Sequence, residues 1–252
     1  QQRGRAGRVA GAGEAMSPIV VNRPEPGVVE LRLNRPDQRN AVNTPLLRQL
    51  RDEIVALGDD RRVKVVVLSG EGSTFCAGAD LNEFAGAVPP GPGDSLARVR
   101  FVIHSIRGLL ELEPITIAAV HGAAVGAGWG LALGCHICWA VEDTTFVLPE
   151  VAKGFRIPRV IVQRLAAVVG PVRAAELVLS GQRIDVDTAM SFGAVTRRFP
   201  DVESMRTEAL AFASSIARQP RTVLRGAIDP LRALAVHGVA PEIEYQWTEK
   251  ET

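Results

Sequence analysis

Short apolar runs separated by polar breaks dominate the first part of the chain. The run Val28–Leu33 ends shortly before Pro36, which lacks the N–H donor that a continuing strand needs. Thr44 and Pro45 then supply a helix N-cap and a first-turn proline, and apolar residues follow them at helical spacing. A second run, Val63–Leu68, is nearly continuous and rich in β-branched residues, which is typical of a strand buried on both faces. This order predicts a βαβ unit.

The middle of the chain continues the alternation. We expect a mobile loop over the site at Pro89–Asp94, where prolines and glycines prevent regular structure, and a helix at Ser95–Leu112. A third strand is predicted at Ile115–Val120, followed by strands at Cys138–Val141 and Thr145–Val147. Further helices are predicted at Val160–Val169, Arg173–Leu179, Val186–Phe192 and Val202–Arg218.

Strands that recur between helices predict an α/β fold with a largely parallel sheet and right-handed crossovers. We expect one core domain at residues 16–200 and a helical C-terminal segment at residues 201–252, which packs on this domain or on a partner subunit. Residues 1–15 precede Met16 and lack an apolar pattern, so we interpret them as an extension outside the fold.

Composition narrows the possible functions. The chain has 252 residues, 46% of them hydrophobic and 23% charged, which is enough to bury a core. A formal net charge of +1, from 29 basic and 28 acidic residues, gives no reason to expect a nucleic acid or an anionic membrane as partner. The sequence shows no spanning apolar run and no signal-peptide pattern, so we expect a cytoplasmic protein. Cys135 and Cys138 lack the second ligand pair of a zinc site, so no metal is expected.

Two segments of small residues follow predicted strands. Phe75–Leu81 has the sequence FCAGADL, and Gly126–Gly128 has the sequence GAG. Their side chains are too small to shield the backbone, so N–H groups in both segments can approach a ligand closely. A helix N-terminus at such a segment also leaves N–H donors without partners inside the helix. Either segment alone is typical of tight packing, but the pair indicates a binding site.

These segments resemble motifs of the enoyl-CoA hydratase/isomerase (crotonase) superfamily. FCAGADL is similar to the family signature F-x-A-G-A-D-[LI], and LNRP at Leu33–Pro36 with RNAV at Arg39–Val42 is similar to L-N-R-P-x-x-x-N-A-[LV]. Ala118–Gly128 and Pro149–Val151 also resemble family motifs, and the match runs in order from about residue 28 to residue 200. The resemblance implies a crotonase (ClpP-like) fold of repeated ββα units that form a spiral of sheets, with a helical C-terminal trimerisation segment.

The resemblance also implies a set of site residues. The backbone N–H groups of Ala79 and Ala127 would form an oxyanion hole for the carbonyl oxygen of an acyl-CoA thioester, and each donor would stabilise the enolate by about 3 kcal/mol. Coenzyme A is part of the substrate, so no separate cofactor is expected. The residues expected to contact coenzyme A are Arg39, Asn40, Ala41, Ala77, Gly78 and Asp80. Asn82 stands where many members have a lysine that helps to bind phosphate.

One carboxylate is available for chemistry. Hydratases of the family use two glutamates, and this chain has Gly130 at the position of the first and Glu150 at the position of the second. A single carboxylate beside an oxyanion hole can remove an α proton and return it at the γ carbon, which needs no activated water. The sequence therefore favours Δ3,Δ2-enoyl-CoA isomerisation. The alternatives are 2-enoyl-CoA hydration in fatty-acid β-oxidation and a catalytically weak acyl-CoA-binding subunit.

Other candidates have weaker support. Arg156 would hold Glu150 ionised or bind an acidic acyl group if it faced inward, and would do neither if it faced outward. His104 and His121 are isolated histidines, which more often fill core or surface positions than act as bases. Trp129 is expected either to pack in the core or to form a pocket wall.

The resemblance implies a homotrimer or a dimer of trimers. The chain stops at Thr252, where relatives usually continue through another helix, so we expect an incomplete pocket wall toward the neighbouring subunit.

Overall fold

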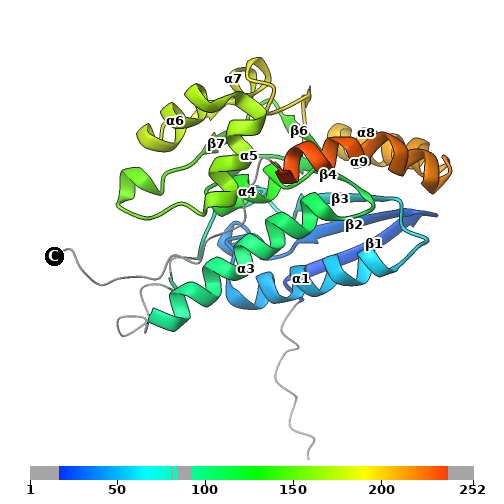
Figure 1. Ribbon diagram of the computed structural model, residues 1–252, viewed down its shortest axis with the longest axis horizontal. Coiled ribbons are helices and arrows are strands. Elements are labelled where there is room, and N and C mark those ends of the chain that lie inside the picture. The colour runs from blue at the N-terminus through cyan, green and yellow to red at the C-terminus, as the bar shows by residue number, and fades with distance from the viewer. Residues whose placement is uncertain (1–16, 81, 84–91, 238–252) are drawn as a thin grey trace, which may run out of the picture.

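Two β-sheets carry the fold, and helices cover both faces of the larger sheet (Figure 1). The computed structural model describes residues 17–80, 82–83 and 92–237, with the side chains of residues 92–98 and 234–237 excepted. The strands are β1 (Ile19–Glu25), β2 (Val28–Leu33), β3 (Val65–Gly70), β4 (Ile115–Val120), β5 (Ala123–Val125), β6 (Ile137–Val141), β7 (Thr145–Val147), β8 (Ile184–Asp185) and β9 (Arg197–Phe199). The α-helices are α1 (Thr44–Asp59), α3 (Pro92–Glu111), α4 (Ala127–Leu133), α5 (Arg159–Val169), α6 (Pro171–Ser180), α7 (Val186–Ser191), α8 (Val202–Ala217) and α9 (Arg221–His237). Two short 3₁₀ helices are η1 (Pro36–Gln38) and η2 (Val151–Lys153).

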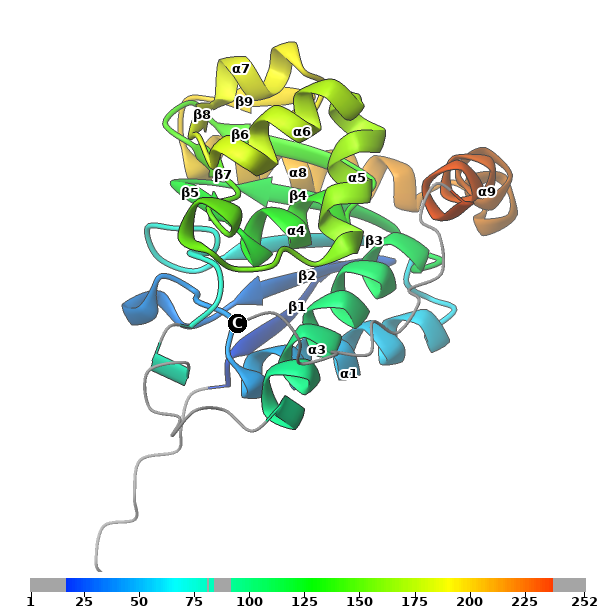
Figure 2. The same ribbon diagram turned by 60° about the vertical axis from the view of Figure 1, so that its left-hand side comes forward.

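The six-stranded sheet has the order β1-β2-β3-β4-β6-β9. Strands β2 to β9 in this order run parallel, and β1 pairs antiparallel with β2. The predicted βαβ unit is therefore confirmed, with α1 as the crossover between β2 and β3. A second sheet of order β5-β7-β8 lies beside α4 (Figure 2).

Strand β3 is buried on both faces, as its apolar run predicts. Val65 and Val67 face a cluster under α8, whereas Val66 and Leu68 face the main core. Alternating side chains of a strand point to opposite faces, so only a continuous apolar run can supply both cores. The strand begins later than the predicted Val63 and extends to Gly70.

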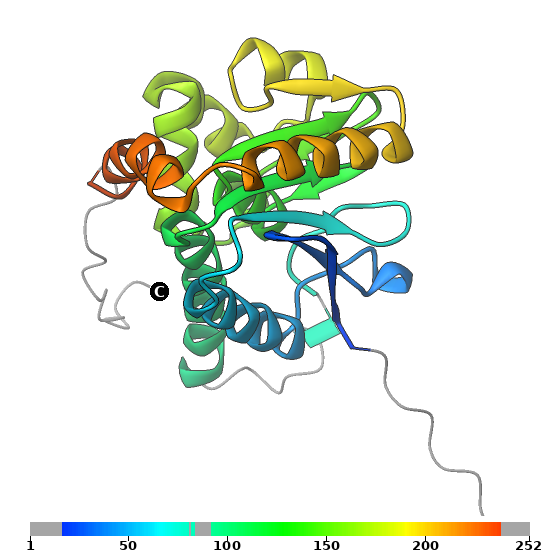
Figure 3. The same cartoon turned by 90° about the vertical axis from the view of Figure 1, so that its right-hand side faces the viewer.

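Helix α8 lies across one face of the sheet (Figure 3). Its buried face consists of Met205 and three alanines, Ala209, Ala213 and Ala217. These small side chains allow the helix to approach the strands closely. The predicted helical C-terminal segment thus packs on its own domain through α8.

An ion pair between a buried carboxylate and a half-exposed arginine links β2 to α8. The side chain of Glu30 is fully buried, and both of its oxygens accept hydrogen bonds from Arg206, at 2.8 and 2.9 Å. Burial by itself raises the pKa of Glu30, but the hydrogen bonds and charge of Arg206 outweigh this effect and hold the pKa below its ordinary value of 4.5.

Helices α1, α3 and α4 contribute to the main core on the other face of the sheet. The side chain of Asn43 accepts a hydrogen bond from the N–H of Leu46 at 3.0 Å, so Asn43 and not the expected Thr44 is the N-cap of α1. The backbone N–H of Thr44 donates instead to the Glu83 carboxylate at 3.0 Å.

The loop before α3 and the short strands differ from the sequence prediction. The expected loop at Pro89–Asp94 is wrong in its second half, because α3 begins at Pro92, and a proline in the first helical turn displaces no hydrogen bond. Residues 89–91, the extension 1–15 and the chain beyond residue 237 lie outside the described residues. The sequence pattern predicts none of the short strands β5, β8 and β9, because two or three residues are too few to carry a strand pattern.

Helix α9 lies at the margin of the molecule, against α3 (Figure 2). Arg221 and Arg225 both pair with Glu113, which follows α3. Val223 and Leu231 expose more than half of their surface. Within the described residues, no helix is long and apolar enough to cross a membrane.

We expect Arg206→Met to lower the free energy of unfolding at pH 7 by about 1 to 2 kcal/mol, because it leaves the buried Glu30 carboxylate with a single arginine partner, Arg32, whose Nε lies 3.9 Å away. The folded-state pKa of Glu30 is lowered, so its stabilising contribution is present above pH 4.5 and is lost as the pH falls below that value. The difference in free energy of unfolding between wild type and Arg206→Met, measured by urea denaturation, should therefore be smaller at pH 4 than at pH 7. Arg62→Met, which removes an exposed partner of Asp60, is the control and should lower the free energy of unfolding much less, because solvent screens an exposed ion pair. Equal losses in both variants would contradict the assignment.

Candidate active site

Three segments that follow neighbouring parallel strands build the site. Residues 34–42 follow β2, residues 71–80 follow β3, and residues 121–127 follow β4 with β5 among them. The carboxyl ends of parallel strands meet at one edge of the sheet, where open α/β sheets bind their ligands. Segments distant in the sequence therefore converge at this edge.

The two segments of small residues lie directly side by side. The N–H of Cys76 donates to the carbonyl of Ala123 at 3.1 Å, and the N–H of Val125 donates to the carbonyl of Cys76 at 3.0 Å. A Cβ at Gly128 would lie 2.5 Å from the Cys76 carbonyl oxygen, and a Cβ at Gly78 would lie 2.8 Å from that of Val125. A side chain at either glycine would therefore push the segments apart.

A bridge to Val42 sets the orientation of the Ala79 peptide. The N–H of Val42 donates to the carbonyl of Gly78 at 2.7 Å, and the N–H of Asp80 donates to the carbonyl of Val42 at 3.0 Å. In such a parallel bridge the central residue directs its own N–H to the opposite side. The N–H of Ala79 finds no acceptor among the described residues, and Ala79 is exposed.

The second candidate donor is at the start of α4. The first helical hydrogen bond runs from the N–H of Gly130 to the carbonyl of Gly126, so the N–H of Ala127 has no partner within the helix. Gly126 precedes it with φ +51° and ψ −116°, a conformation that favours glycine. Within the described part of the chain, Ala79 and Ala127 thus each have a backbone donor without an acceptor.

The carboxylate of Glu150 lies against Gly126. A Cβ at Gly126 would lie 2.3 Å from Oε1 of Glu150, so the glycine leaves the space that the carboxylate occupies. Oε2 is buried and has no hydrogen-bond partner among the described residues. Burial raises the pKa of Glu150 above its ordinary value of 4.5, while its own backbone N–H and the charge of Lys153 oppose the rise. A half-buried carboxylate with one oxygen unpartnered among the described residues and with a raised pKa is suited to proton transfer.

Apolar side chains fill the surroundings of Gly130. A Cβ there would lie 2.8 Å from Cδ1 of Ile106 and from Cδ1 of Ile161. Both isoleucines are fully buried. This position therefore lacks a carboxylate, and the atoms nearest to it are apolar carbons that cannot hold a water molecule.

The residues expected to contact coenzyme A are brought together, although their side chains differ in role. The N–H of Ala77 donates to the carbonyl of Arg39 at 2.9 Å, and Arg39 is exposed with φ +49°. Asn40 is fully buried, and its amide donates to the carbonyls of Glu71 and Thr74 at 2.8 and 2.7 Å. Asn40 thus holds two loops together, and its backbone N–H is also engaged, because it donates to the carbonyl of Arg35 at 2.9 Å.

Asp80 is engaged inside the protein. Its Oδ2 lies 2.8 Å from Nη2 of Arg35, and its Oδ1 accepts the N–H of Asn82 at 3.1 Å. Arg35 was not among the sequence-predicted site residues. Its place in the LNRP motif was the available signal, but only the tertiary contact reveals its partner.

The side chains of the other candidates are exposed or packed in the core. His104 is exposed on α3, and His121 is buried with Nε2 3.0 Å from the Gly72 carbonyl oxygen. Arg156 is exposed, which agrees with its outward alternative. Trp129 is 1% exposed and packs against Phe146 with ring centroids 5.5 Å apart.

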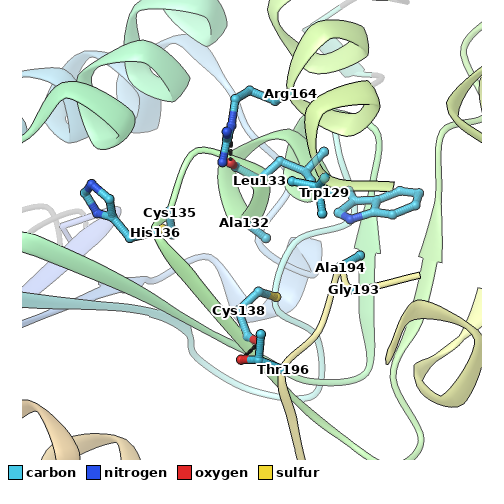
Figure 4. Close-up of a pocket in the computed structure, with 11 residues that line it drawn as sticks. Trp129, Ala132, Leu133, Cys135, His136, Cys138, Arg164, Gly193, Ala194 and Thr196 are labelled. Atoms are coloured by element: carbon cyan, nitrogen blue, oxygen red, sulfur yellow. Dashed lines mark hydrogen bonds between the residues drawn. The ribbon is translucent and has the colours of Figure 1, made fainter. Parts of the chain in front are cut away.

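A separate cavity of about 60 Å³ lies between α4, α5 and the start of β6 (Figure 4). Arg164 lines it and donates from Nε to the Leu133 carbonyl at the end of α4, at 3.0 Å. Trp129 and Cys138 also line this cavity. None of its described lining residues is Ala79, Ala127 or Glu150, so it is distinct from the candidate active site.

Comparison with known proteins yields a family match and relatives with two named activities. The model of the family "Enoyl-CoA hydratase/isomerase" matches residues 23–243. The chain is 38% identical to 2,3-dehydroadipyl-CoA hydratase of Escherichia coli (strain K12) over 219 residues, which is 86% of this chain and 82% of the relative. It is 30% identical to the mitochondrial Delta(3,5)-Delta(2,4)-dienoyl-CoA isomerase of Rattus norvegicus over 240 residues, or 91% and 73% of the two chains.

Solved structures share the fold. An enoyl-CoA hydratase from Bacillus anthracis superposes with a TM-score of 0.80 at 29% identity, covering 88% of this chain and 90% of that one. A monofunctional enoyl-CoA isomerase from M. smegmatis superposes with a TM-score of 0.73 at 25% identity, covering 90% and 100%. The expected crotonase fold is confirmed.

We expect the Glu150 carboxyl to titrate above pH 4.5 in the folded protein, because burial disfavours its charged form. Carbon-13 NMR of glutamate-labelled protein measures this pKa, and Glu150→Gln identifies the resonance. Gly126→Ala should move the pKa toward the ordinary value, since the new methyl group displaces the carboxylate toward solvent.

Gly170→Ala is the matched control, because Gly170 also has a positive φ, of +85°, but no heavy atom lies within 4 Å of its Cβ position. It should leave the Glu150 titration unchanged. A wild-type pKa at or below 4.5 would contradict the burial argument.

Proposed function

The chain belongs to the enoyl-CoA hydratase/isomerase family, and from the geometry of its site we propose that it is an enoyl-CoA isomerase that shifts a double bond from Δ3 to Δ2. Members of this family are enzymes that act on acyl-CoA thioesters. The observation that carries the isomerase assignment is the carboxylate of Glu150, which lies against Gly126 and whose buried Oε2 has no partner among the described residues, with isoleucines around Gly130.

The two backbone N–H groups act on the thioester carbonyl. We place its oxygen between the N–H groups of Ala79 and Ala127, both of which lack acceptors among the described residues. Loss of an α proton transfers charge to this oxygen, and donors that are fixed beforehand stabilise that charge without reorganisation. Each donor accounts for about 3 kcal/mol of transition-state stabilisation.

Glu150 moves the proton. Its ionised carboxylate removes a proton from C2 of a 3-enoyl thioester, and the electron pair of that bond passes into a dienolate. The resulting carboxylic acid returns the proton at C4, so the double bond ends between C2 and C3 and no atom is gained or lost. A raised pKa favours both halves of this cycle, because the group must accept and then release the same proton. Coenzyme A enters and leaves with the substrate.

Hydration is the second candidate, because the relative that is 38% identical is named a 2,3-dehydroadipyl-CoA hydratase. A hydratase must hold and activate water, for which family members use a second glutamate. Ile106 and Ile161 at that position weigh against hydration. An acyl-CoA-binding subunit with little activity is the third alternative.

We expect purified wild-type protein to conjugate a 3-enoyl-CoA without taking up heavy oxygen from labelled water, as followed by ultraviolet absorbance and mass spectrometry. Glu150→Gln should lower kcat at least about 10³-fold, because the amide cannot accept the proton, while acyl-CoA affinity changes less than about threefold. Glu176→Gln, at an exposed position of α6, is the control and should retain full activity.

Heavy-oxygen uptake into a 2-enoyl-CoA would establish hydration instead. Binding without turnover of either substrate would favour the subunit alternative. Unchanged turnover in Glu150→Gln would remove this residue from the mechanism.

We also propose a homotrimer, alone or as a dimer of trimers. The exposed side chains of Val223 and Leu231 on α9 support a subunit contact at this margin of the molecule. With 27.0 kDa per chain, a trimer would have a mass of about 81 kDa and a hexamer a mass of about 162 kDa. In sedimentation equilibrium, Leu231→Lys should lower the average mass toward that of the monomer, whereas Val172→Lys, at an exposed position of α6, should not. A wild-type monomer at micromolar concentration would contradict the proposal.

A further inference from the structure

Arg35 joins the two segments that hold the Ala79 peptide. One arm of its guanidinium lies 2.8 Å from Oδ2 of Asp80, the residue after Ala79. The other arm donates from Nη1 to the carbonyl of Ala41, the residue before Val42. One side chain therefore clamps both strands of the bridge between Val42 and Ala79.

The clamp is largely shielded from water. The side chains of Arg35 and Asp80 expose 16% and 8% of their surface. Asp80 has a second tie, since its Oδ1 accepts the N–H of Asn82. A charge-assisted contact in such a setting is stronger and more directional than an exposed ion pair.

Arg35 is itself held in place by Asn40. Oδ1 of Asn40 accepts the N–H of Arg35 at 2.8 Å, and the N–H of Asn40 donates to the carbonyl of Arg35 at 2.9 Å. The Asn40 amide also binds the carbonyls of Glu71 and Thr74. The guanidinium thus projects from a backbone that is anchored to the loop after β3.

The Ala79 peptide needs such support. It follows Gly78, whose φ is +91°. Other residues are strained at a positive φ, and glycine has few steric restrictions that would fix the conformation there. Its own N–H makes no bond with the described protein that would fix its direction. Its orientation therefore depends on the contacts of Gly78 and Asp80.

We propose that Arg35 is a positioning residue, which aims the N–H of Ala79 at the thioester oxygen by holding Asp80 and Ala41 together. This role rests on the proposed oxyanion hole. Arg35 acts through its two partners and is assigned no contact with substrate. Its two-armed geometry is essential, because a lysine ammonium is a point charge that can meet one partner well but lacks the planar fork that reaches both.

Kinetics should separate this role from binding. Arg35→Met is expected to lower kcat for the 3-enoyl-CoA about 10- to 100-fold, a part of the effect of losing one oxyanion donor, with KM changed less than about threefold. Arg35→Lys should recover part of the loss. Asp80→Asn should lower kcat to a similar extent. The double variant Arg35→Met with Asp80→Asn should have the same kcat as Arg35→Met alone, because the two residues act as one unit.

Infrared difference spectroscopy tests the hole without turnover. Hexanoyl-CoA labelled with carbon-13 at the thioester carbonyl should show a carbonyl stretch at lower wavenumber when bound to the wild type than in water. Arg35→Met should lose most of this shift. Arg206→Met is the control, because it removes another arginine from a buried carboxylate, Glu30, away from the site, and should retain both the shift and kcat.

The outcomes are distinct. A wild-type shift that persists in folded Arg35→Met, or in Asp80→Asn if the methionine variant does not fold, would overturn the role of Arg35 and leave the oxyanion hole intact. The absence of a shift in wild type with bound hexanoyl-CoA would overturn the hole, and the role of Arg35 with it. An equal loss of the carbonyl shift and of kcat in Arg206→Met would show a general effect of instability and would also overturn the positioning role of Arg35.

Discussion

The close approach of two backbone segments is the constraint on which the site depends. Residues 76–79 and 124–128 pack in direct contact, and a Cβ at Gly78 or Gly128 would come within 2.8 or 2.5 Å of a carbonyl oxygen of the other segment. This contact brings the peptide of Ala79 and the first turn of α4 to one place. Chemistry that relies on backbone donors therefore requires small residues more strictly than it requires any particular side chain.

The parallel sheet explains why these segments meet. Strands β2, β3 and β4 are neighbours in register, and each is followed at its carboxyl end by a segment of the site. The sheet is fixed on one face by α8 and on the other by the main core. A rigid frame of this kind can hold loops in conformations that the loops alone would not keep.

Buried carboxylates in this protein fall into two classes. Glu30 and Asp80 each have an arginine partner at 2.8 Å and serve to hold elements together. Glu150 has no such partner, its Oε2 lacks any hydrogen bond among the described residues, and burial raises its pKa. The difference is physical: the hydrogen bonds and charge of Arg206 favour the ionised form of Glu30, whereas a carboxylate without a cation in an apolar setting can exchange a proton.

The sequence by itself determined the alternation of the longer strands and helices, the family and the residue types of the candidate site. Apolar periodicity located β2, β4 and most helices, because burial of a strand or a helix leaves a direct pattern in the chain. The motifs around Ala79, Ala127 and Glu150 were likewise visible, since glycine and alanine are needed wherever backbones touch.

Only the tertiary structure decided what each polar side chain does. It assigned Asp80 and Asn40 to contacts within the protein, turned Arg156 to the surface and revealed Arg35 as the link between Ala41 and Asp80. It also showed that the carboxylate of Glu150 occupies the space left by Gly126. Such contacts join residues far apart in the sequence, and their distances and burial leave no periodic signal in a single chain.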